Sequence, residues 1–175
     1  MKLLVAVVSL FALLGVAVAA DAPANPLINS SHDFYGLMKR DVLGSADKMP
    51  EADYSFSPTP EVRTYGKLLA HIANAQFLFC SIVADGKPTM KNFETTAKTK
   101  ADIVAALNEG FNYCDSVYQK LTDADAAAMV PFFGQERTKL SLLDFNIAHG
   151  FEHYGNLVTY MRMKGIVPPS SEKKK

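Results

Sequence analysis

Residues 149–169, HGFEHYGNLVTYMRMKGIVPP, contain two of the four histidines in this chain of 175 residues. His149 and His153 stand four residues apart, a spacing that places two side chains on one face of an α-helix. At about 100° per residue, Tyr160 falls on the same face as the histidines, whereas Glu152 falls on the opposite face. We therefore expect both histidines to point into the interior of a helical protein.

Two further stretches carry the end signals of long helices, and a stretch near the N-terminus is also expected to be helical. Thr59 and Pro60 mark the start of one, and Thr99 with Asp102 has the spacing of a capping box at the start of another. The last helix, which contains the two histidines, is closed by Gly165 and a pair of prolines. No strand-like alternation lasts long enough to build a sheet, so we predict an all-α fold, a four-helix bundle. The helices are expected over about residues 30–48, 60–84, 96 or 99 to 120, and 135–164, with a short extra turn at residues 122–125.

A third histidine, His71, lies on the predicted helix 60–84. It shares the apolar face of that helix with Phe79, so it should also point inward. Three imidazoles that face one interior are unfavourable unless their nitrogens have partners. Neutral imidazole is a common metal ligand, and three such ligands leave coordination positions open for water or substrate. The pattern predicts a metal site formed by His71, His149 and His153; the alternative is a set of hydrogen-bonded core histidines.

Several polar residues around the predicted site are candidates for supporting roles. Tyr160 is a candidate hydrogen-bond donor to a bound ligand, although a core aromatic with its hydroxyl at the rim would follow the same pattern. Asn146 and Asn156 flank the histidines and are candidates to hydrogen-bond the ligating side chains, with packing or surface positions as the alternative. His32, near the start of the first predicted helix, is expected to be partly exposed.

The pentapeptide from His149 to His153 also matches H-x-x-E-H, the inverted zinc-peptidase signature, in which Glu152 would be the general base. Two features speak against that assignment. Glu152 falls on the polar face of the predicted helix, and only 22 residues follow His153, whereas such peptidases take a further carboxylate ligand from much farther downstream. We interpret the match as a coincidence.

The first 20 residues, MKLLVAVVSLFALLGVAVAA, begin with a positive charge, continue as an apolar run and end in small residues. This is the anatomy of a secretory signal peptide with an A-x-A-like cleavage site. A retained membrane anchor is the alternative, since the run approaches the roughly 20 residues that a spanning helix needs. We expect an exported protein, periplasmic or secreted, with no membrane contact after cleavage.

The overall composition excludes some classes of partner. Hydrophobic residues make up 49% and charged residues 21%, the balance of a globular protein. Lys+Arg and Asp+Glu are equal at 18 each, so no global field would attract nucleic acid, and we expect no nucleic-acid partner. The single basic run, EKKK, is expected to be a solvated tail.

Export would give Cys80 and Cys114 an oxidising setting in which a disulfide can persist. Two buried thiols on separate helices are the alternative. The sequence does not supply the Cα separation that decides between them, and we lean towards free thiols.

The stretches LLAHIANAQ around His71 and AHGFEHYGNLVTYMRMKGIVPP resemble the DinB-like (DinB/YfiT) superfamily. That family carries a histidine on its second helix and closes its fourth helix with H-x-x-x-H-x-G-Q-L-x-x-Y-L-R-x-x-G-x-x-P-P. Asn156 replaces the usual glutamine and Met161 the usual leucine, and Asn74 and Gln76 stand near where many relatives carry a glutamate. The motif positions that match are His149, His153, Gly155, Leu157, Tyr160, Arg162, Gly165, Pro168 and Pro169.

The resemblance implies a four-helix bundle with a long crossover, often dimeric, that holds one divalent metal ion on His71, His149 and His153. Nickel, zinc and iron are all found in such proteins. Characterised members include metal-dependent thiol transferases and a thiol-dependent isomerase. The leading expectation is therefore a metal-dependent transferase or hydrolase that acts on a small molecule. The alternative is a non-catalytic metal- or ligand-binding dimeric module of the cell envelope.

These inferences divide the chain into four parts. They are a signal peptide (1–20), an N-terminal extension (21–29), the DinB-like bundle (30–170) and a basic tail (171–175).

Overall fold

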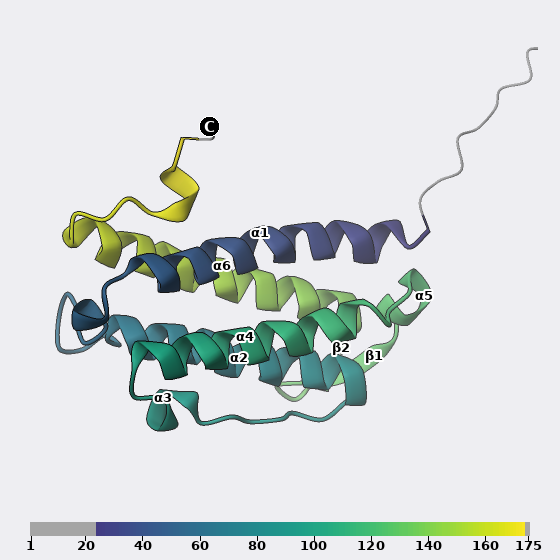
Figure 1. The fold of residues 1–175 in the computed structure, drawn as a ribbon. Coiled ribbons are helices and arrows are strands. Elements are labelled where there is room, and N and C mark those ends of the chain that lie inside the picture. Colours follow the sequence, from purple (N-terminus) through teal and green to yellow (C-terminus); the bar gives the residue numbers. More distant parts are fainter. Residues whose placement is uncertain (1–23, 174–175) are drawn as a thin grey trace, which may run out of the picture.

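The computed structural model of the chain describes residues 24–173, and its framework is a set of four long helices (Figure 1). The predicted signal peptide, 1–20, lies outside the described residues, as do residues 21–23 of the predicted extension and the last two residues of the basic tail. The long helices are α1 (Pro26–Lys48), α2 (Tyr65–Asp85), α4 (Lys100–Tyr118) and α6 (Lys139–Met163). The short elements are η1 (Glu51–Asp53), α3 (Phe93–Thr96), α5 (Asp123–Ala126), β1 (Met129–Phe132), β2 (Gln135–Thr138) and η2 (Pro169–Ser171).

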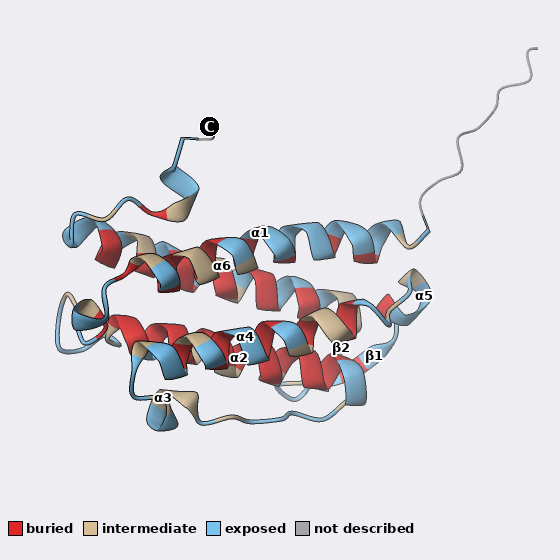
Figure 2. Cartoon of the chain, in the orientation of Figure 1, coloured by how far each residue is buried: buried red, intermediate tan, exposed pale blue. Residues whose placement is uncertain are grey.

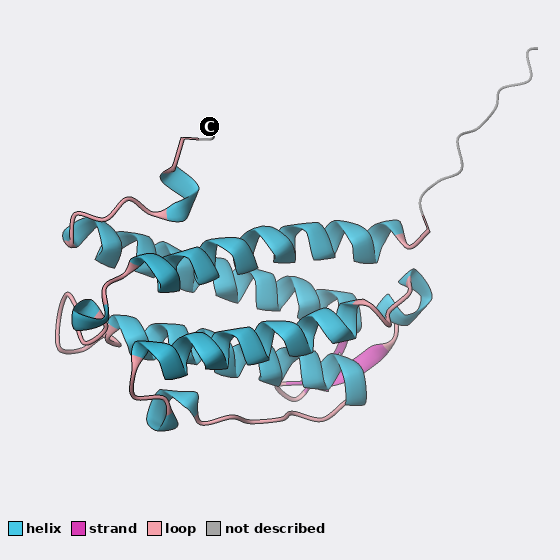
Figure 3. Cartoon of the chain, viewed as in Figure 1, coloured by secondary structure: helices cyan, strands magenta, loops and turns pink. Residues whose placement is uncertain are grey.

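The long helices pack as a bundle in which α2 contacts α4 and α6, and α1 contacts α6 and α4. Helices α1 and α6 run in one direction and α2 and α4 run in the other (Figure 1). Because α2 and α4 point the same way, the chain returns along the length of the bundle between them. Residues 86–99 make this crossover, which contains the short helix α3 (Figure 3). The predicted all-α four-helix bundle with a long crossover is confirmed.

Each long helix turns one face toward a shared core (Figure 2). Fully buried large side chains come from all four, among them Tyr35 of α1, Leu69 of α2, Phe111 of α4 and Leu157 of α6. Burial of a side chain of this kind contributes roughly 1.5–3 kcal/mol. Within residues 24–173, α2 is the one helix long and apolar enough to cross a membrane. Since 72% of its apolar window is buried inside the bundle, we interpret α2 as a core helix.

Helix α2 begins five residues later than the predicted start at Pro60. Its cap is Thr64, whose hydroxyl accepts a hydrogen bond from the backbone N–H of Lys67 at 3.4 Å. The preceding residues are held in a loop, because the backbone N–H of Tyr65 donates to the carbonyl of Phe56 at 2.8 Å. The predicted start was wrong because the local pattern of threonine and proline carries no information about this tertiary bond.

Helix α6 also begins later than predicted, at Lys139 rather than near Gln135. The preceding residues form β2, which pairs with β1 as an antiparallel hairpin. The two-residue loop of this hairpin, Phe133 and Gly134, has positive φ at both positions, 48° and 74°, as in a type I′ turn. Each strand has only four residues, too few for a recognisable alternation, so the sequence analysis missed this small sheet.

The starts of α4 and α5 follow the sequence signals more closely. Thr99 and Asp102 form the predicted capping box of α4. Thr122 and Asp125 form a second capping box at the start of the expected extra turn, α5. Helix α1 starts at Pro26, earlier than predicted, so it includes the end of the predicted N-terminal extension.

Cys80 of α2 and Cys114 of α4 form a disulfide with their Cα atoms 5.4 Å apart, so the inclination towards free thiols was wrong. Both residues are fully buried. Helix α4 comes this close to α2 because Gly110, one turn before Cys114, has no side chain. A Cβ atom at Gly110 would lie 2.9 Å from the carbonyl oxygen of Ala73. The bridge therefore ties together the two helices that the crossover connects.

Removal of the disulfide should destabilise the bundle. We expect the double variant Cys80→Ala/Cys114→Ala to lose about 3–4 kcal/mol of unfolding free energy, because the bridge joins residues 34 positions apart in the sequence. Urea unfolding followed by circular dichroism measures the change. Dithiothreitol should lower the unfolding midpoint of the wild type and leave that of the double variant unchanged. Two titratable thiols in the unfolded, unreduced wild type would show that the bridge does not exist.

Candidate metal centre

The three predicted histidines converge between α2 and α6. His71 comes from α2, and His149 and His153 come from successive turns of α6. The Nε2 atom of His149 lies 3.3 Å from Nε2 of His71 and 3.0 Å from Nε2 of His153. The candidate ligand atoms of the three rings all lie within 4.8 Å of one another. Helical spacing thus brings three imidazole nitrogens to one point in the bundle.

These separations suit nitrogens that share one metal ion. Two nitrogens about 2.1 Å from an ion, at an angle of about 90–110°, lie roughly 3.0–3.4 Å from each other. Shared protons alone do not satisfy the group, because Nε2 of His149 faces two nitrogens and can donate its proton to only one. The Nδ1 atoms of His149 and His153 are also buried without a hydrogen-bond partner among the described residues. A cation that accepts all three lone pairs would remove the conflict between the Nε2 atoms.

The two histidines of α6 are neutral near pH 7. Burial lowers the pKa of His149 to about 4, and the nearby charges of His153, His71 and Arg63 add to the effect. Burial also lowers the pKa of His153, with His71 as the next cause. Metal ions bind the neutral ring, so burial keeps these two side chains in the form that can ligate.

Glu94 supplies a carboxylate that the sequence analysis did not find. It belongs to α3 in the crossover, and its Oε1 atom lies 2.8 Å from Nδ1 of His71. Asn74 holds α3 in place, because its side-chain oxygen accepts the backbone N–H of Phe93 at 3.0 Å. Glu94 is 23 residues from His71 in the sequence and reaches it only through the folded crossover, so no local pattern marks it.

The ionised carboxylate of Glu94 fixes the tautomer of His71. Burial raises the pKa of this carboxyl, but hydrogen bonds from Arg63 and His71 outweigh burial and lower the pKa overall. The bond from Arg63 joins Nε to Oε2 at 2.9 Å. Because an ionised carboxylate only accepts, Nδ1 of His71 carries the proton and Nε2 presents its lone pair. Carboxylate partners of this kind orient metal-binding histidines and raise their basicity.

Two cavities flank the histidines. The larger, of about 380 Å³, has His153, Tyr160 and Asn156 in its wall. The smaller, of about 190 Å³, has His71 and His149 in its wall. Each of the three imidazole rings therefore borders a cavity.

Tyr160 and Asn156 line the larger cavity without bonding to the histidines. The hydroxyl of Tyr160 donates to the backbone carbonyl of Arg63 at 3.0 Å, the rim position considered as the alternative for this residue. Asn156 is exposed at the edge of the cavity. Both stay candidates for contact with a ligand, but the bond to Arg63 already occupies the hydroxyl proton of Tyr160.

Asn146 pairs with Gln76 rather than with a histidine. Both side chains are fully buried. Nδ2 of Asn146 donates to Oε1 of Gln76 at 2.9 Å, and Nε2 of Gln76 donates to Oδ1 of Asn146 at 3.2 Å. This reciprocal pair satisfies two buried amides, as stable cores require. It accounts for the burial of Asn146 without any contact to a ligand.

His32 and Glu152 lie away from the site. His32 is exposed, as expected, and its ring lies 4.9 Å from the ring of Tyr118. Glu152 is exposed on the polar face of α6. That position agrees with the interpretation of the H-x-x-E-H match as a coincidence.

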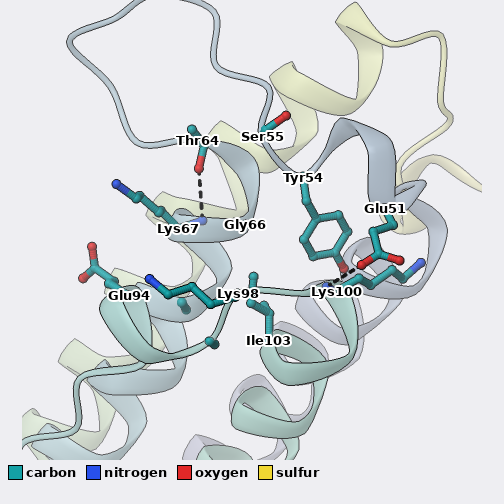
Figure 4. A pocket seen from close by; sticks show the side chains of 12 residues that line it. Glu51, Tyr54, Ser55, Thr64, Gly66, Lys67, Glu94, Lys98, Lys100 and Ile103 are labelled. Atoms are coloured by element: carbon teal, nitrogen blue, oxygen red, sulfur yellow. Dashed lines mark hydrogen bonds between the residues drawn. The ribbon is translucent and has the colours of Figure 1, made fainter.

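A third cavity, of about 360 Å³, also has Glu94 in its wall (Figure 4). Its wall includes Lys67, Lys98 and Lys100, together with Glu51. None of the three histidines is among the described residues that line it. Glu94 therefore lies between the histidine site and a separate basic cavity.

The part of the chain that forms the bundle and the histidine site matches a known protein family. Residues 37–157 match the model of the DinB superfamily. This range is more than half of the chain and includes all three histidines and the crossover. The chain belongs to the DinB superfamily.

Solved structures of relatives share the fold. The DinB-like protein YjoA from Bacillus subtilis is 21% identical, with a TM-score of 0.68 over 83% of this chain and 100% of that chain. By sequence, the uncharacterized protein YjoA is 24% identical over 127 residues, 69% of this chain and 79% of that protein. A DinB-like protein from Bacillus cereus is 19% identical, with a TM-score of 0.71 over 81% of this chain and 95% of that chain.

A mycothiol-dependent maleylpyruvate isomerase also resembles this structure. It is 13% identical, with a TM-score of 0.64. The similarity covers 78% of this chain but only 61% of the isomerase. It shows a shared fold for that part of the isomerase.

Loss of the charge on Glu94 should weaken metal binding. We expect Glu94→Gln to lower metal affinity about 10–100-fold, because the neutral amide no longer orients and polarises His71 as a carboxylate does. Competition against a chromogenic chelator measures the affinity. Glu109→Gln, which alters an exposed partner of Lys91, is the matched control and should bind metal as the wild type does. Equal affinity in Glu94→Gln and wild type would mean that this carboxylate does not support the site.

Proposed function

We propose that the protein is an exported metalloprotein in which His71, His149 and His153 bind one divalent metal ion. We further propose that it acts on a small molecule as a metal-dependent transferase or hydrolase. The observation that carries the proposal is the convergence of the three imidazoles, with the Glu94 carboxylate on the first of them. Three protein ligands leave coordination positions for a substrate, the pattern of reactive rather than purely structural sites.

A divalent ion bound there would supply Lewis-acid chemistry and lower the pKa of a bound water or thiol. The side chains of the protein have other tasks. Glu94 orients His71, and burial keeps His149 and His153 neutral. The two flanking cavities provide room for reactants beside the imidazole rings.

The proposed metal is nickel, zinc or iron. Imidazole nitrogens suit all three ions, and an all-nitrogen set does not select among them. Carboxylate and carbonyl oxygens, which calcium and magnesium prefer, do not form the candidate ligand set.

Two features support export. The first 20 residues have the pattern of a signal peptide, and a fully buried disulfide is typical of proteins from oxidising compartments. The structural similarity to a mycothiol-dependent isomerase supports a thiol as one class of co-substrate. For an exported protein, such a thiol would have to be present outside the cytoplasm.

A non-catalytic metal- or ligand-binding module, dimeric and in the cell envelope, is the second candidate. It is favoured by the absence of a free reactive group beside the histidines in the described structure. Both cysteines are in the disulfide, and Glu94 is held by Arg63 and His71. An exchangeable coordination position with turnover favours the enzyme, whereas a closed coordination sphere favours the binding module.

Elemental analysis of the mature protein, expressed from about Asp21 without a tag, tests the metal site. The wild type should hold about one equivalent of a transition metal, and His149→Ala should lose it because one of three ligands is missing. His32→Ala, which changes the exposed histidine outside the site, should keep the metal. If the wild type holds none even after reconstitution, the histidines are core polar residues and the proposal fails.

A further inference from the structure

Arg63 lies where the two cavities beside the histidines meet, because it lines both of them. Its position is fixed twice: its carbonyl accepts from the hydroxyl of Tyr160, and its Nε donates to Glu94. Its two Nη groups make no hydrogen bond to any residue between positions 24 and 173. The side chain is 44% exposed. The guanidinium is therefore held by Nε and still has donors for a ligand.

The charge around Arg63 favours an anionic ligand. Glu94 carries one negative charge and bonds both Arg63 and His71, so a bound divalent ion and the guanidinium together would leave the site positive. An anion beside Arg63 would balance this excess, and a carboxylate matches the planar fork of a guanidinium.

The smaller cavity provides an apolar surface next to Arg63. Its wall includes Ala75, Leu78, Phe79 and Met90, and Met90 is 68% exposed although it is apolar. At about 30 Å³ for each water-sized group, roughly six such groups fill a cavity of this volume. A short hydrocarbon chain or a small ring would fit there.

The larger cavity is less suited to an anion. Its wall includes the carboxylate of Glu61, whose pKa is lowered by hydrogen bonds from Thr59 and from its own backbone. An ionised carboxylate repels a second one. The smaller cavity also has a carboxylate in its wall, that of Glu94, but this charge is offset by the guanidinium of Arg63, which is bonded to it. The apolar part of an anionic ligand should therefore enter the smaller cavity, with its charged end at Arg63.

We propose that Arg63 binds the carboxylate of a small, partly apolar carboxylic acid whose hydrocarbon part lies against Leu78, Phe79 and Met90, beside His149. The inference rests on the proposed function, since it assigns a substrate class to the same histidine site. Arg63 is a specificity-determining residue in this account, and its guanidinium is the group that selects for the charge.

Isothermal titration of the metal-loaded protein with hexanoate, acetate and the uncharged analogue hexanamide tests the proposal. Arg63→Gln should weaken hexanoate binding about 10-fold or more, because a hydrogen bond to a charged group is lost. Lys67→Gln removes the same charge from a residue that lines the third cavity and neither of the two cavities beside the histidines, and it should bind hexanoate within about twofold of the wild type. Hexanamide should bind the wild type at least about 10-fold more weakly than hexanoate, with no further loss in Arg63→Gln.

A second variant tests the apolar part. Met90→Asn changes an exposed side chain, so it should fold normally, and it should weaken the binding of hexanoate more than that of acetate. The proposal is overturned if hexanoate does not bind the wild type, if Arg63→Gln binds it equally well, or if hexanamide binds as tightly as hexanoate.

Metal content, measured on every sample, separates this proposal from the proposed function. If the wild type holds no metal but Arg63→Gln still weakens hexanoate binding, the metal site fails and the anion site stands. If metal is retained and hexanoate binding does not depend on Arg63, the anion site alone fails. Arg63→Gln could also lose the metal, because Glu94 then lacks its bond from Arg63. In that case hexanoate binding is compared between the metal-free wild type and metal-free Arg63→Gln, and equal binding overturns the proposal.

Discussion

The hydrogen bond between Nδ1 of His71 and the carboxylate of Glu94 determines the chemistry of the site. It places the proton of His71 on the side away from the other imidazoles, so that Nε2 offers a lone pair toward the point where the Nε2 atoms of His149 and His153 also lie. Arg63 supports the arrangement by bonding the second oxygen of the carboxylate. Charge-assisted hydrogen bonds are shorter and stronger than neutral ones. Without Glu94, the ring of His71 could adopt either tautomer, and metal binding would have to select the one with its lone pair on Nε2.

The topology of the bundle makes this bond available. Because α2 and α4 run in the same direction, the crossover carries α3 back along the bundle to α2 (Figures 1 and 3). Asn74, three residues after His71, captures the backbone of Phe93 and so sets Glu94 opposite the imidazole. The disulfide holds α4 against α2, the two helices that the crossover connects. The long connection of the fold thus provides the group that orients a ligand.

What could be predicted from the sequence is the part of the site that depends on helical periodicity. The four-residue spacing of His149 and His153 gave their common face, and the apolar stripe of α2 gave the direction of His71. Glu94 could not be predicted, because its place depends on the path of the crossover rather than on local spacing. Arg63 could not be predicted either, because it lies within the predicted helix 60–84 but before the start of α2 at Tyr65. Glu94 and Arg63, the two charged residues beside the histidines, therefore come from segments outside the long helices.

Anomalous diffraction from crystals of the mature protein, recorded on both sides of the absorption edge of its metal, tests the central claim most directly. The account predicts one dominant peak about 2.0–2.1 Å from the Nε2 atoms of His71, His149 and His153, with Glu94 bonded to Nδ1 of His71. A peak at another position, such as the basic cavity around Lys98, would contradict the account. So would the lack of any peak from a protein that contains stoichiometric metal.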